Sequence, residues 1–261
     1  MESELLIKKA NGVLTLTINR PMSKNALSLT LYDSLLKSLE DAEQDSSIGV
    51  VVLTGTGDTF CAGGDVKRMA ATVEPQSFED RVAKLRSRAR ISEMLHGMRK
   101  PTIAMMRGSA VGAGLSLALA CDFRIVDTSV RLSTGFLKVG LSGDFGGHYF
   151  LPRLVGMAKA RELYLTSAVV LADEALRIGL VNRVVDPDQL ETSVYEMAEA
   201  MAAGPRVAIG YVKENLNQAM ELSLAKMLDA EVFRHVRCVE TNDHKEAVAA
   251  FVEKRKPVFN L

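Results

Sequence analysis

Two glycine-rich junctions constrain this chain more than any other feature of its sequence. Residues 60–65 read Phe-Cys-Ala-Gly-Gly-Asp, and residues 108–114 read Gly-Ser-Ala-Val-Gly-Ala-Gly. Each junction follows an apolar, β-branched run and precedes a helical pattern, so each is expected to join a strand to a helix. Without bulky side chains, both can direct backbone N–H groups at one point, as a carbonyl oxygen requires when negative charge develops on it. The sequence therefore predicts an oxyanion hole.

The pattern around these junctions predicts an α/β protein. Asn11-Gly12 separates two short apolar runs, which is typical of a β-hairpin. Residues 28–44 have helical spacing with Ser28 as N-cap, and residues 48–53 are apolar throughout, as in a strand buried on both faces. We expect an α/β body over residues 1–190. A helical region follows over residues 191–261 and packs on its own sheet or on a neighbouring subunit.

Composition excludes several classes of protein. Lys plus Arg equals Asp plus Glu at 32 each, and this balance argues against a nucleic-acid binder. The long uncharged run over residues 108–121 is shorter than the ~20 residues that span a bilayer, and the first residues lack the order of a signal peptide. Neither the three cysteines nor the four histidines have the spacing of metal ligands. We expect a cytoplasmic protein with free thiols and no metal or membrane association.

Asp144 is a second candidate for chemistry. It lies in the turn Gly-Asp-Phe-Gly-Gly over residues 143–147, just before a run that reads as a helix. The sequence leaves two interpretations open, a helix N-cap or a catalytic base. His148 is close enough to take part, whereas Ser116 lacks the nucleophile elbow of a serine hydrolase. Neither glycine junction has the Gly-Lys-Ser/Thr ending of a phosphate-binding loop.

In combination these motifs resemble the crotonase superfamily, also called the enoyl-CoA hydratase/isomerase family, over essentially the whole chain. The shared segments are residues 18–21, 25–27, 60–65, 100–101, 108–114, 121–122, 140–141, 146–147, 151–156, 172–182 and 251–257. The resemblance implies a spiral of β-β-α units, a helical C-terminal trimerisation region, and homo-trimers or hexamers. It also implies acyl-CoA thioester substrates, with no separate cofactor because CoA is part of the substrate.

The resemblance further implies roles for individual residues. The oxyanion donors would be the backbone N–H groups of Gly64 and Ala113. The CoA moiety would lie along Lys24, Ala26, Ala62, Asp65 and Val66, with Phe251 and Lys254 at its nucleotide end, in some members from a neighbouring subunit. The acyl pocket would include Ser116, Phe136, Leu137 and His148, and its walls would come from residues 66–90.

The departures from the family pattern bear on the reaction. Ser116 and Phe136 occupy the positions where hydratases of this family carry two glutamates, so two-glutamate hydration is not expected. Asp144 falls where dienoyl-CoA isomerases and 4-chlorobenzoyl-CoA dehalogenases keep a catalytic aspartate. Within the family, the chain looks most similar to the 1,2-epoxyphenylacetyl-CoA isomerases of bacterial phenylacetate degradation.

Three functions follow from this pattern. The leading prediction is an acyl-CoA isomerase that shifts a double bond or rearranges an epoxide, with Asp144 as both base and acid. The second is a hydratase or lyase in which Asp144 or His148 handles water. The third is a non-catalytic acyl-CoA-binding protein that retains the oxyanion hole.

Overall fold

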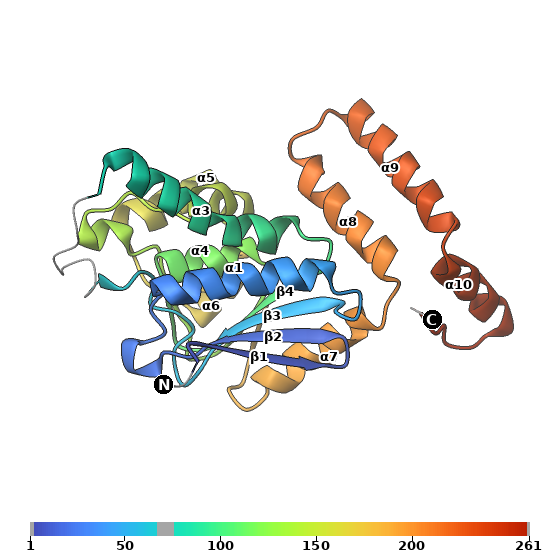
Figure 1. Cartoon of the computed structure of the whole chain (residues 1–261), viewed down its shortest axis with the longest axis horizontal. Coiled ribbons are helices and arrows are strands. Elements are labelled where there is room, and N and C mark those ends of the chain that lie inside the picture. Colours follow the sequence, from blue (N-terminus) through green and yellow to red (C-terminus); the bar gives the residue numbers. More distant parts are fainter. Residues whose placement is uncertain (1–2, 67–75, 260–261) are drawn as a thin grey trace.

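A six-stranded sheet forms the centre of the molecule in the computed structural model, which describes residues 3–66 and 76–259 (Figure 1). Its order is β1 (Leu5–Ala10), β2 (Val13–Ile18), β3 (Val50–Gly55), β4 (Thr102–Met106), β6 (Phe123–Asp127) and β9 (Arg183–Val185). The β1–β2 pair is antiparallel and the other pairs are parallel. Asn11 and Gly12, with φ of 51° and 75°, form the tight turn of the predicted hairpin.

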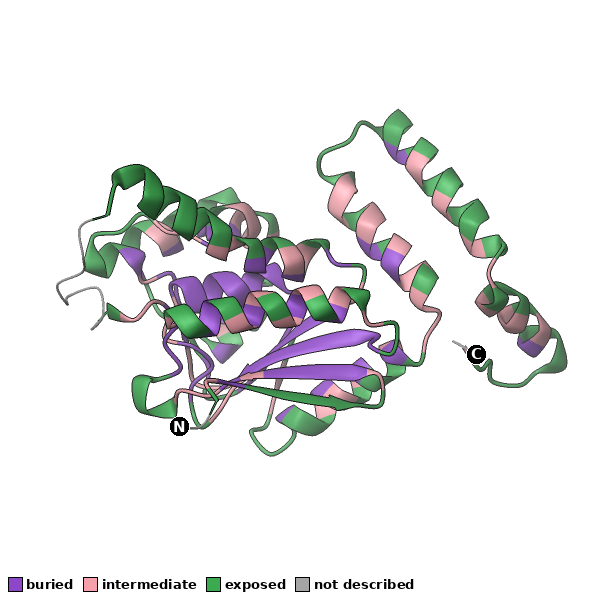
Figure 2. Cartoon of the chain, viewed as in Figure 1, coloured by how far each residue is buried: buried purple, intermediate pink, exposed green. Residues whose placement is uncertain are grey.

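The central strands β3 and β4 are buried on both faces, as their uninterrupted apolar sequences predicted, whereas the edge strand β1 is mostly exposed. Alternate residues such as Leu16 and Leu53 pack beneath α1 (Leu29–Gln44), α3 (Phe78–Gly97) and α4 (Ala113–Ala120). The intervening residues, such as Val52 and Ile103, pack on α7 (Leu190–Ala202). The predicted cap of α1 is confirmed, because the Ser28 hydroxyl accepts a hydrogen bond from the backbone N–H of Leu31. Figure 2 shows the central strands in purple between these layers, with the edge strand β1 in green.

A second, three-stranded sheet lies beside the first. It consists of β5 (Ser109–Val111), β7 (Arg131–Ser133) and β8 (Val170–Leu171). The remaining body elements are η1 (Pro21–Ser23), η2 (Phe136–Val139), α5 (Gly147–Thr166) and α6 (Ala172–Arg177). Strand β5 lies within the second glycine junction, where the sequence indicated a turn alone.

Three helices extend from the body as an arm, visible at the right of Figure 1: α8 (Arg206–Ala219), α9 (Leu224–Val239) and α10 (Asn242–Glu253). Helix α7 does not belong to this arm, because Leu190, Val194 and Ala198 are fully buried against the sheet. The arm therefore begins after α7, and the segment predicted to be a separate helical region from residue 191 includes this core helix. Among the described residues, no helix combines the length and the apolar character needed to cross a bilayer.

Candidate active site

The two glycine junctions lie side by side at the carboxyl end of the parallel strands. Cys61 and Ala110 form an isolated bridge, in which Cys61 N–H donates to the Ser109 carbonyl and Val111 N–H donates to the Cys61 carbonyl, at 3.1 and 3.0 Å. The approach is so close that a side chain on Gly114 would lie 2.4 Å from the Cys61 carbonyl oxygen. Glycine is therefore required where the two backbones meet.

The backbone amides of this meeting point can face a common ligand. A Cβ on Gly63, which has φ of 89°, would lie 3.4 Å from the amide nitrogen of Ala113. Ala113 is the first residue of α4, and its cap, Gly112, has no side chain to accept the helix's first N–H groups. Within residues 3–66 and 76–259, no backbone acceptor is recorded outside the helices for the N–H of Gly64 or Ala113. Both amides are thus able to donate to a bound oxygen.

Four of the residues predicted along CoA are brought together beside Gly64. Ala62 N–H donates to the Lys24 carbonyl at 3.0 Å, and Leu27 N–H donates to the Gly63 carbonyl at 2.8 Å, so residues 24–27 run alongside residues 62–64. The Arg20 guanidinium ties this pair of segments together, because it donates to the Ala26 carbonyl and lies 3.3 Å from the Asp65 carboxylate. Residues 24–27 and 62–65 thus form a continuous strip that adjoins the Gly64 amide.

The other predicted CoA residues lie apart from this strip or at its edge. Val66 is 53% exposed at the end of the described segment, and residues 67–75 of the expected pocket wall lie outside the described residues. Phe251 and Lys254 lie at the end of α10, and Phe251 is 86% exposed. Helix α10 is far from α4 in the same chain (Figure 1). If these two residues contact CoA, as predicted, they would do so from a neighbouring subunit of an oligomer.

Asp144 is held by a loop anchored in the core. The next residue, Phe145, has φ of 51° and is 2% exposed, and its ring stacks on Tyr32 with centroids 5.4 Å apart. The Phe145 carbonyl accepts a hydrogen bond from the Ser92 hydroxyl at 2.8 Å. Helix α5 begins after Gly146, which serves as its cap without a side-chain hydrogen bond. The N-cap interpretation of Asp144 is therefore wrong.

The carboxylate of Asp144 is poorly solvated. Its Oδ1 atom is buried and has no hydrogen-bond partner among the described residues. Burial raises the pKa of Asp144 from 3.8 to about 6, because removal from water disfavours the charged form. A carboxylate with a pKa near 6 is a much better base near neutral pH than an ordinary aspartate.

The predicted pocket residues surround the same loop. Phe136 is buried, with its ring 3.6 Å from where a Gly112 side chain would begin, whereas Leu137 is 49% exposed. His148 lies over Gly143 and stacks on Tyr164, with ring centroids 4.1 Å apart. Ser116 is buried on α4 and donates to the Gly112 carbonyl at 3.3 Å.

Tyr164 also lies at this loop, and no sequence motif predicted it. It is the eighteenth residue of α5, and nothing in its immediate neighbours separates it from an ordinary apolar position of an amphipathic helix. Its proximity to Asp144 depends on the path of the helix.

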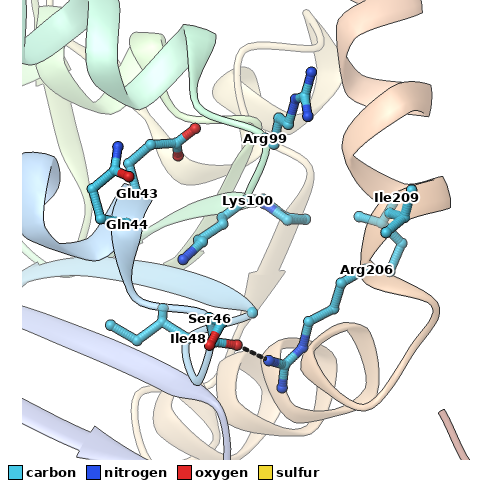
Figure 3. Close-up of a pocket in the computed structure, with 11 residues that line it drawn as sticks. Glu43, Gln44, Ser46, Ile48, Arg99, Lys100, Arg206 and Ile209 are labelled. Atoms are coloured by element: carbon cyan, nitrogen blue, oxygen red, sulfur yellow. Dashed lines mark hydrogen bonds between the residues drawn. The ribbon is translucent and has the colours of Figure 1, made fainter. Parts of the chain in front are cut away.

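A separate cavity of about 560 Å³ lies at the opposite end of the sheet, next to the amino ends of β3 and β4 (Figure 3). Its cationic side chains already have partners within the chain. Arg206 donates to the Ser46 carbonyl at 2.6 Å, Lys100 donates to the Asp45 carbonyl at 2.6 Å, and Arg99 bonds Glu214 at 2.6 Å. The cavity is remote from the amides and from Asp144, so it is not part of the candidate active site.

Two glycine junctions meet at the carboxyl end of the parallel sheet, and a loop with one desolvated carboxylate precedes α5, so the chain is an α/β protein with a candidate active site at that end of the sheet. The sequence profile of the enoyl-CoA hydratase/isomerase family matches residues 8–261, and the chain belongs to that family. It processes acyl-CoA thioesters as a member of this enzyme family, and its fold is the crotonase fold.

Individual relatives cover the chain almost completely. The short-chain-enoyl-CoA hydratase of Clostridium acetobutylicum is 35% identical over 257 residues, 97% of this chain and 96% of the relative. The trans-2-decenoyl-[acyl-carrier-protein] isomerase of Streptococcus mutans is 31% identical, covering 98% and 97%. The crystal structure of an enoyl-CoA hydratase from Bacillus anthracis is 33% identical, with a TM-score of 0.92 over 98% of this chain and 99% of that one.

Proposed function

We propose that the protein is an acyl-CoA isomerase that moves a double bond along the acyl chain. The observation that carries the proposal is the desolvated carboxylate of Asp144, on a loop that shares its neighbour Phe136 with Gly112, the residue before Ala113. Ser116 and Phe136 hold the positions where the hydratase mechanism would need carboxylates, and neither side chain can act as a general base. One base that both removes and returns a proton is what an allylic shift requires.

The thioester oxygen accepts hydrogen bonds from the N–H groups of Gly64 and Ala113. Asp144 removes a proton from the acyl carbon next to the double-bond system, and the electron pair moves onto the thioester oxygen as an enolate. The same carboxyl group then returns the proton at another carbon. One missing oxyanion donor typically costs about 2.7–4 kcal/mol, and a positioned general base contributes about 10²–10⁴-fold, so the two elements carry comparable shares of the catalysis.

The test uses a 3-enoyl-CoA substrate and follows the appearance of the conjugated 2-enoyl thioester by absorbance and mass. Asp144→Asn removes the base while keeping the shape of the side chain, and it should abolish isomerisation while leaving acyl-CoA binding nearly unchanged. Asp188→Asn, at an exposed position, is the matched control and should behave as wild type. Near-normal rates in Asp144→Asn would sink the assignment. The same assay with an aryl epoxide thioester as substrate tests whether the protein rearranges an epoxide.

Hydration is the second candidate, because the Clostridium acetobutylicum and Bacillus anthracis relatives carry the name of enoyl-CoA hydratase. In that reaction Asp144 or His148 would activate the water. Crotonyl-CoA distinguishes the two activities, since hydration destroys the conjugated absorbance and adds the mass of one water. Tight acyl-CoA binding without turnover of any thioester would instead favour a non-catalytic binding protein.

We also propose that the arm packs against further copies of the chain, as a homo-trimer or hexamer. Helices α8, α9 and α10 expose large apolar side chains that the body of the same chain does not cover, among them Leu224, Val232, Phe233 and Phe251. A monomer would leave this surface in water. Light scattering on wild type and on a Val232→Asp, Phe233→Asp double variant tests the proposal, and a wild-type monomer would contradict it.

A further inference from the structure

Helix α5 folds back on itself behind Asp144. Tyr164 lies 17 residues beyond Gly147, and a straight helix would separate the two by about 25 Å. They are nevertheless in contact, because Gly156, with φ of 77° and ψ of 157°, breaks the helix and reverses the path of its second half. His148 and Tyr164 therefore stack face to face, with an interplanar angle of 14°.

Two hydroxyl groups meet where the two halves of α5 approach α4. A side chain on Gly147 would begin 2.3 Å from the Tyr164 Oη atom and 2.7 Å from the Ser116 Oγ atom. Both oxygens therefore occupy the space that a side chain at position 147 would fill. Gly147 N–H in turn contacts the Asp144 carbonyl at 3.3 Å, which places this pair directly behind the catalytic loop. Because Gly147 has no side chain, the Tyr164 phenol can pack against its backbone.

The Tyr164 phenol stays protonated in this setting. Burial and the charge of Asp144 both raise the pKa of Tyr164 above its ordinary value of 10.0, and the second effect shows that the two groups sense each other. Asp144 Oδ1 is buried and has no hydrogen-bond partner among the described residues. A buried acceptor without a partner is poorly satisfied and is stabilised by a donor that comes within reach.

The other titratable or charged groups around the loop approach from three helices. His148 comes from α5, and Tyr32 from α1 stacks on Phe145. The Arg88 guanidinium from α3 lies over the Tyr32 ring at 5.4 Å from its centroid. Tyr164 is the donor whose pKa responds to the charge of Asp144 and whose hydroxyl lies against Gly147, three residues beyond Asp144.

We infer that Tyr164 is a positioning residue for proton transfer, whose hydroxyl donates to the Asp144 carboxylate through one intervening oxygen atom, of a water or of the substrate. In this arrangement the Tyr164 hydroxyl fits next to the small side chain of Ser116. An uncharged donor there supports the charged form of Asp144 while adding no second base. The inference rests on the proposed function of Asp144 as the base of the reaction.

The test compares Tyr164→Phe, which removes one oxygen atom, with Tyr149→Phe as a matched control. Tyr149 lies on the same helix, and its hydroxyl bonds Glu221 at 2.8 Å at an exposed position. Loss of a donor to a charged group disfavours the anion, so Tyr164→Phe should raise the pKa of Asp144 by about half to one unit. The pKa is read from the Asp side-chain carbon signals by NMR, assigned with Asp144→Asn. Tyr149→Phe should leave it unchanged.

Kinetics provides a second readout. In Tyr164→Phe we expect the acid limb of the pH profile of kcat to move to higher pH by the same amount as the Asp144 pKa. We also expect kcat to fall about tenfold relative to wild type, with KM within about twofold of the wild-type value. An unchanged or lowered Asp144 pKa in Tyr164→Phe, with the thermal melt and circular dichroism of wild type, would overturn the inference. The NMR titration needs no turnover, so it tests Tyr164 even if the isomerase assay fails, and Asp144→Asn tests the base even if Tyr164 is inert.

Discussion

Replacing Asp144 by asparagine should make the protein more stable while it loses its activity. In the folded protein the pKa of this carboxyl group is about 6, compared with 3.8 when it is solvated. Each unit corresponds to about 1.36 kcal/mol, so keeping Asp144 charged in the folded state costs up to about 3 kcal/mol. The group is partly exposed, and solvent screening reduces this to about 1–3 kcal/mol.

The sign of the effect follows from proton binding. The folded protein binds a proton at Asp144 more tightly than the unfolded chain does, so protonation stabilises the fold and this stability is lost as pH rises through about 6. At about pH 8 the free energy of unfolding of Asp144→Asn should therefore exceed that of wild type by the full amount of about 1–3 kcal/mol. The difference should shrink as the pH falls below 6 and vanish below 3.8, where the carboxyl group is neutral in both states.

Urea unfolding at several pH values, at one fixed protein concentration, measures this difference. Asp188→Asn is the control for a generic loss of negative charge and should follow wild type at every pH. A pH-independent difference between wild type and Asp144→Asn would refute the reasoning, as would a variant that is less stable at high pH. Either result would mean that Asp144 is not a desolvated carboxylate in solution.

Three further outcomes follow from the same geometry. In wild type, kcat/KM for isomerisation should rise with pH and level off above about 6, since Asp144 must be charged to accept a proton; a flat profile from acid to neutral pH would exclude it as the base. Gly63→Ala should lower kcat by about 10²-fold, because its Cβ would lie 2.6 Å from the Val111 carbonyl and displace the oxyanion donors, whereas Gly57→Ala has a similar positive φ with nothing closer than 3.9 Å and should keep its activity. Arg20→Gln should raise KM for acyl-CoA more than it lowers kcat, since Arg20 joins the two segments of the strip; steady-state kinetics that show the reverse would contradict a CoA-binding role for the strip.

Much of the local structure was determined by the sequence alone. Asn11-Gly12 specified a tight turn because asparagine and glycine tolerate positive φ, and Ser28 marked the start of α1 because its hydroxyl can satisfy a free N–H group. The C-terminal region is helical as predicted, because its helices have their own amphipathic periods. These signals act over a few residues, which is why a single sequence carries them.

Contacts between distant segments were decided only by the tertiary structure. Strand β5 forms because β7 pairs with it on one side and Cys61 bridges to it on the other, although its three residues carry no strand pattern. Helix α7 joins the core because the sheet's second face needs apolar cover, which its own amphipathic pattern could not distinguish from a subunit contact. Tyr164 approaches Asp144 only because α5 reverses at Gly156. The physical reason is the same in each case: burial and close approach depend on which surfaces meet, and residues far apart in sequence supply them.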